Sequence, residues 1–142
     1  MRLVIDTSVI IKAVRNFSGA SAALIQEAVR RRVILLMSTP LWLEYESVVR
    51  RSEHWISPGF GAEEAGRFLD VLANAATTVE IQFRWRGLLP DPDDDMVLET
   101  AINGGADALV TFNDLDFAPA VAAFGLELRR PDAILAALRD RS

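Results

Sequence analysis

The sequence predicts an α/β fold with three layers, in which helices cover both faces of a central parallel sheet of four to five strands. Two observations lead to this fold class. Short apolar runs alternate along the chain with longer stretches in which apolar residues recur at helical spacing. The runs at residues 2–5 and 33–37 are apolar almost throughout, which is typical of parallel strands that are buried on both faces.

Each element has its own local signal. The segments predicted as strands are residues 2–5, 33–37, 77–81, 108–111 and 126–128, of which the last is expected at an edge. The segments predicted as helices are residues 21–31, 39–51, 62–74, 93–103, 120–123 and 131–138, preceded by a helix for which Thr7 or Ser8 is the expected N-cap. Thr39 and Pro40 are expected as the N-cap and first position of their helix, and Gly104-Gly105 as a helix stop.

Length and composition limit the class of protein. The 142 residues suit a single domain spanning 1–142, with 51% hydrophobic and 25% charged residues. There is no cysteine, and no apolar stretch is long enough to cross a membrane, so we expect a cytoplasmic protein without a membrane partner. The net charge of −5 argues against a general polyanion binder. All basic residues except Lys12 are arginines, which suit phosphate contacts but also suit solvated helix ends.

Acidic residues stand where strands end or helices begin. They are Asp6 after the first strand, Glu44 in the helix at 39–51, the run at 91–95, and Asp114 with Asp116 after the strand at 108–111. In a parallel sheet these positions gather beyond the carboxyl ends of the strands, where ligands bind. Carboxylates brought together there repel one another unless a divalent cation lies between them.

Helical phase separates some neighbours within these clusters. Asp94 lies three and four residues before the apolar Val97 and Leu98, so it is expected to point inward, with Asp93 and Asp95 at the flanks. Asp95 is kept as the second choice. Glu44 stands among large apolar side chains, although an exposed Glu44 beside a buried Glu46 is the alternative.

These motifs resemble the PIN-domain ribonucleases, specifically the branch of toxin components related to VapC. The resemblance covers nearly the whole chain and is carried by the stretches VIDTSVII, STPLWLEYESVV and DPDDDMVLETAINGGADALVTFN, and by the final strand and helix. It implies a metal-dependent endoribonuclease that binds Mg²⁺ or Mn²⁺ through Asp6, Glu44, Asp94 and Asp116, with Asp95 as a further candidate ligand. Around them Thr7, Ser8, Thr111 and Asn113 are expected to orient the ligands.

The resemblance also implies partners: an RNA substrate, a small antitoxin protein and a second copy of the chain in a homodimer. Whether Asn113, Asp114 or Asp116 completes the acidic site stays open at this point. So do the number of metal ions, the RNA target and the antitoxin. The alternative function is a PIN-like RNA- or protein-binding module that has lost its metal and its nuclease activity.

Overall fold

The computed structural model describes residues 1–141, and over this range five strands form one fully parallel sheet with the order β3-β2-β1-β4-β5. The strands are β1 (Arg2–Ile5), β2 (Ile34–Met37), β3 (Ala76–Thr78), β4 (Ala108–Val110) and β5 (Leu128–Arg129). The predicted α/β class with a central parallel sheet is therefore confirmed. β1 lies at the centre, pairing with β2 on one side and with β4 on the other.

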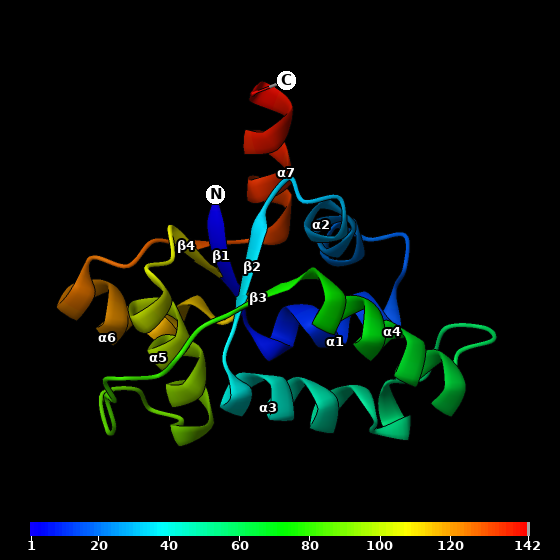
Figure 1. The fold of residues 1–142 in the computed structure, drawn as a ribbon, viewed down its shortest axis with the longest axis horizontal. Helices are drawn as coiled ribbons and strands as arrows, with labels where there is room; N and C mark the ends of the chain where they lie inside the picture. Colours follow the sequence, from blue (N-terminus) through cyan, green and yellow to red (C-terminus); the bar gives the residue numbers. More distant parts are fainter. Residues whose placement is uncertain (142) are drawn as a thin grey trace.

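Helices cover both sides of this sheet, so the three-layer prediction is also confirmed (Figure 1). They are α1 (Thr7–Arg15), α2 (Ala20–Val29), α3 (Thr39–Val49), α4 (Ala62–Ala75), α5 (Asp95–Gly104), α6 (Asp114–Phe124) and α7 (Pro131–Asp140), with short 3₁₀ turns η1 (Ser52–His54) and η2 (Pro92–Asp94). Figure 1 shows α5 and α6 on one side of the strands and α1, α2 and α4 on the other, and α7 packs against α2. None of the helices in residues 1–141 has the length and apolar character needed to cross a bilayer.

The direction of chain crossover changes between the two central strands. The chain leaves β1 through α1 and α2 toward β2, whereas it leaves β4 through α6 toward β5 on the opposite side. A crevice opens beyond the carboxyl ends of two parallel strands where connections diverge in this way, and it is the usual ligand position in open α/β sheets. Asp6 and Thr111 are the residues that directly follow these two strands.

Several predicted boundaries were wrong for reasons of neighbouring structure. The strand predicted at 77–81 pairs only over Ala76–Thr78, because its partner β2 ends at Met37 and the chain there turns into α3. The edge strand predicted at 126–128 is Leu128–Arg129. The short helix predicted at 120–123 extends from Asp114 to Phe124, with two aspartates in its first turn and Pro119 inside it.

The N-caps of two helices also lie one or two residues before the predicted positions. Ser38, rather than Thr39, is the N-cap of α3, and its hydroxyl accepts a hydrogen bond from the Leu41 amide at 3.4 Å. Asp6, rather than Thr7 or Ser8, occupies the N-cap position of α1. The side chain of Asp6 makes no capping bond there, so its carboxylate is left to interact with the residues that follow β4.

Candidate acidic site at the carboxyl ends of the central strands

Asp6 is held by hydroxyl groups from two different parts of the chain. Its side chain is 1% exposed, and its Oδ2 accepts hydrogen bonds from Ser8 Oγ and from Thr111 Oγ1, each at 2.8 Å. Thr7 Oγ1 lies 3.5 Å from Oδ1 and contributes at most a weak bond. The bond from Thr111 joins the ends of β1 and β4, so the two central strands together determine where this carboxylate lies.

The same hydroxyl groups also order the chain after β4. Thr111 Oγ1 accepts from the backbone amide of Asn113 at 2.9 Å, and Ser8 Oγ accepts from that of Phe112 at 3.3 Å. The segment that leads into α6 is therefore anchored to the residues around Asp6. Of the predicted orienting residues, Ser8 and Thr111 bond directly to Asp6, while Asn113 enters this network through its main chain and has an exposed side chain.

Asp94 is the carboxylate whose electrostatic environment is most perturbed. It is 9% exposed at the end of η2, as the helical phase predicted. Burial raises the pKa of Asp94 to about 7, and the negative charges of Asp6, Asp91, Asp116 and Asp93 contribute to this increase, in that order of importance. Asp6 and Asp116 thus lie close enough to Asp94 to oppose its ionisation, although they come from β1 and α6.

Asp95 was expected at a flank but is 3% exposed, and this expectation was wrong. It begins α5, and its Oδ1 is buried with no hydrogen-bond partner in the described structure. Its charge acts instead on Glu99, one turn further along the same helix. Burial raises the pKa of Glu99, and the nearby Arg86 and Arg84 guanidinium groups oppose that increase.

Glu44 and Glu46 are both half-buried on α3. Burial therefore does not decide which of the two glutamates points toward the site. Glu44 is not among the groups that raise the pKa of Asp94. Within residues 1–141, no three acidic or histidine side chains are grouped closely enough to coordinate one metal ion as they stand. The structure therefore gathers Asp6, Asp94 and Asp116 electrostatically, without forming a closed set of ligands.

Tyr45 is a residue of this region that the sequence reasoning did not single out. It is fully buried on α3, and its hydroxyl donates a hydrogen bond to the Ile5 carbonyl, next to Asp6. Burial raises the pKa of Tyr45 well above its usual value, and the charge of Asp6 adds to this increase. The sequence around Tyr45 does not reveal this contact, because the contact depends on how α3 packs on β1.

A rim of mixed charge surrounds the acids near β5. Arg130, the N-cap of α7, lies over the Phe112 ring at 5.8 Å and 3.6 Å from Asp114 Oδ2. Both members of this ion pair are more than half exposed, so water screens their attraction. Asp114 is therefore oriented toward Arg130 at the rim, whereas the half-buried Asp116 interacts with Asp94.

The fold and this acidic cluster together define an α/β protein with a carboxylate site at the switch point of a parallel sheet. A family model described as PIN domain matches residues 2–115. The chain belongs to the PIN domain family. No sequence among curated proteins matches the chain.

One solved structure shares the fold across almost the full chain. It is a chain of VapBC2 from Rickettsia felis, crystallised with a DNA fragment from their promoter. The match has a TM-score of 0.61 and covers 92% of this chain and 98% of that chain, at 17% sequence identity. At this identity the likeness concerns the fold.

Proposed function

We propose that this chain is a divalent-metal-dependent endoribonuclease and that it acts as the toxin of a toxin–antitoxin pair. The observation that carries the proposal is the state of Asp94. This side chain is buried to nine-tenths among the carboxylates of Asp6, Asp91, Asp93 and Asp116, and its pKa is raised to about 7. A site that opposes the ionisation of its own carboxylate favours the binding of a cation.

The donor chemistry fits Mg²⁺ or Mn²⁺. All the candidate donors are hard oxygens, and the chain has no cysteine and only one histidine. Mg²⁺ commonly keeps several waters and takes only one or two carboxylates from the protein, so a loose cluster of acids is compatible with it. We assign the ligand role to Asp6, Glu44, Asp94 and Asp116, with Asp95 as a further candidate.

The residues have distinct tasks in this proposal. Hydrogen bonds from Ser8 and Thr111 hold the Asp6 carboxylate in one orientation, which a metal ligand requires. Asp94 and Asp116 lie at the starts of α5 and α6, and the charge of Asp116 raises the pKa of Asp94. When bound, a divalent ion lowers the pKa of water and offsets the charge that develops on a phosphodiester during hydrolysis.

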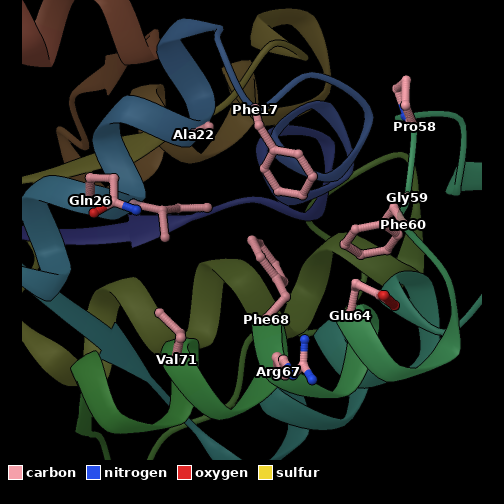
Figure 2. Close-up of a pocket in the computed structure, with 11 residues that line it drawn as sticks. Phe17, Ala22, Gln26, Pro58, Gly59, Phe60, Glu64, Arg67, Phe68 and Val71 are labelled. Carbon is pink, nitrogen blue, oxygen red and sulfur yellow. The ribbon is translucent and has the colours of Figure 1, made fainter.

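The antitoxin part of the proposal is supported by the VapBC2 likeness and by an apolar groove. Figure 2 shows this groove between α2 and α4, where Phe68 of α4 lies opposite Phe17, and the rings of Phe17 and Phe60 contact each other at 5.5 Å. The cavity measures about 370 Å³, and Phe17 is 51% exposed. An amphipathic segment of a partner protein would cover this surface, with Glu64 and Arg67 at its rim.

Purified protein and a single-stranded RNA test the nuclease proposal. We expect cleavage in Mg²⁺ or Mn²⁺, none in EDTA, and none from Asp6→Asn or Asp94→Asn variants that keep the parental circular dichroism spectrum. Asp70→Asn is the matched control, because Asp70 is exposed on α4, far along the chain from the acids. Cleavage by Asp6→Asn and Asp94→Asn at the parental rate would show that the site assignment is wrong.

Two further measurements separate the toxin role and the alternative function from the nuclease activity. Expression in a bacterial host should arrest growth, and co-expression of the neighbouring open reading frame should relieve the arrest. The alternative, a binding module without metal, is supported by the absence of a closed ligand set in residues 1–141. Calorimetric titration with Mn²⁺ decides between the two, since heat of binding that Asp94→Asn abolishes excludes the alternative.

A further inference from the structure

An irregular segment beside the acidic cluster has a backbone that is fastened to α5. Asn103 Oδ1 accepts hydrogen bonds from the backbone amides of Gln82 and Phe83, at 3.0 and 2.9 Å. Asn103 Nδ2 donates a hydrogen bond to the Phe83 carbonyl at 2.8 Å. Three bonds from one side chain fix this part of the loop without any regular secondary structure. The side chains of the loop are thus presented from a backbone that is held in place.

A second attachment lies one helical turn closer to the acids. Glu99 is 2% exposed, and its Oε1 lies 3.3 Å from Arg86 Nε. The backbone amide of Trp85 also interacts with this carboxylate. Glu99 and Asn103 are four residues apart on α5, so the helix holds the loop at two points along one face.

The loop carries aromatic and cationic residues in alternation, in the order Phe83, Arg84, Trp85, Arg86. Phe83 is 63% exposed, although a large apolar side chain of this kind usually packs inside. Its ring lies 6.2 Å from that of Trp85, which in turn meets the edge of Phe124 at 5.1 Å. The result is a row of aromatic rings with one exposed end, flanked by two arginines.

This loop lies next to the acidic cluster rather than on a remote face. Arg84 and Arg86 line a small cleft of about 80 Å³ together with Met96, Glu99 and Ser38. Met96 is the second residue after Asp94, and Glu99 lies roughly 6–8 Å beyond the acids along the helix axis, at 1.5 Å per residue.

We propose that the segment 82–87 binds single-stranded RNA as it leaves the acidic site, through phosphate contacts from Arg84 and Arg86 and base stacking on Phe83. This inference rests on the proposed nuclease function and names the surface that holds its substrate. Arginine pairs provide phosphate contacts, and exposed rings stack with any base. A protein with a net charge of −5 needs such a local surface, because its overall field repels RNA.

The test uses the full chain and a labelled oligouridylate of roughly 12 nucleotides, with anisotropy measured in EDTA at several salt concentrations. We expect Phe83→Ala to raise the Kd on the order of tenfold without changing its salt dependence, because only stacking is lost. We expect Arg84→Gln to lower the slope of log K against log salt by about 0.7, the value for one phosphate contact with a single strand. Arg86 is left unchanged, because its removal would break the ion pair with the buried Glu99.

Matched controls and the cleavage assay make the result decisive. Ile56→Ala, also at an exposed apolar side chain, and Arg50→Gln, at the exposed end of α3, should keep the parental Kd and salt slope. If Phe83→Ala and Arg84→Gln also keep both values while the parent cleaves RNA, this inference is wrong and the nuclease proposal stands. If these variants bind RNA normally but lose a protein partner, the segment is a protein interface. A parent that neither binds nor cleaves RNA overturns both proposals.

Discussion

The Thr111 hydroxyl donates a hydrogen bond of 2.8 Å to the Asp6 carboxylate, although 105 residues separate the two along the chain. Both side chains are buried, at 0% and 1% exposure. The bond crosses the switch point between β4 and β1, the place where an open parallel sheet exposes a crevice. The fold therefore positions Asp6 through a contact that neither strand provides alone.

Thr111→Val tests this relationship with little change in side-chain volume. We expect the variant to lose about 1–3 kcal/mol of unfolding free energy, because a buried carboxylate loses one donor and the Asn113 amide loses its acceptor. RNA cleavage should fall as well, since Asp6 is then held by Ser8 alone. Urea unfolding measures the first effect. Thr77→Val at an exposed edge position is the control, and equal losses in the two variants would contradict the argument.

The raised pKa of Asp94 predicts a pH-dependent stability of the metal-free protein. The folded chain holds the Asp94 proton up to about pH 7, whereas in the unfolded chain this carboxyl has its ordinary pKa of 3.8. Between these values folding takes up a proton, so the unfolding free energy decreases as pH rises from about 4 to about 7 and then levels. Calorimetric Tm values across this range measure the decline.

Asp94→Asn provides the control for this pH effect. Because the amide does not ionise, the variant should lose most of the decline and be more stable than the parent near neutral pH. Glu99, whose pKa is also raised, acts in the same direction and remains in both proteins. The difference between the two Tm curves therefore isolates Asp94. A difference that stays constant from about pH 4 to about pH 8 would exclude the proposed environment of this carboxyl.

The position that completes the acidic site can be decided among three neighbours. Asp116 raises the pKa of Asp94, whereas Asp114 faces Arg130 at the rim and the Asn113 side chain is exposed. We therefore expect Asp116→Asn to raise the Mn²⁺ concentration for half-maximal cleavage at least about tenfold. Asp114→Asn and Asn113→Ala should remain near the parental value. A larger effect from either of these two would move the fourth ligand to that position.

Much of this arrangement could be predicted from the sequence, because the central strands carry strong local signals. The apolar run that ends at Ile5 predicts a strand that is buried on both faces, and the parallel-sheet rule then brings Asp6 and Asp116 to the same edge. Edge elements were less predictable. The length of β3 depends on where β2 ends, which no local pattern in residues 76–81 reveals.

The details of the site depend on tertiary contacts that are equally invisible in the sequence. Helical phase predicted that Asp95 lies at a flank, but it is buried. Its burial depends on how α5 packs against the rest of the protein. The bond from Tyr45 to the Ile5 carbonyl requires the packing of α3 against β1. Likewise, residues 82–86 form an irregular loop that is bonded to Glu99 and Asn103 of α5. These two residues are four positions apart, like many pairs in any helix, so their spacing does not reveal the contact.

Alanine at either glycine at the end of α5, Gly104 or Gly105, should destabilise the protein, whereas alanine at Gly66 in α4 should stabilise it. A Cβ at Gly104 would lie 2.8 Å from Val79 Cγ2 and 3.0 Å from Leu36 Cδ1, both on buried side chains. Gly104→Ala should therefore destabilise the protein by about 1–3 kcal/mol through overpacking. Gly105 has φ of 62°, so Gly105→Ala should cost about 1 kcal/mol by strain alone.

Gly66 gives the contrasting case within a helix. It lies inside α4, its φ is not in the left-handed region, and a Cβ there would meet no atom within 4 Å. Alanine removes backbone freedom from the unfolded chain without adding a clash, so Gly66→Ala should stabilise the protein by about 0.5–1 kcal/mol. Chemical denaturation of the three variants measures these changes. A loss of stability in Gly66→Ala, or no loss in Gly104→Ala, would show that α4 and α5 do not pack as described.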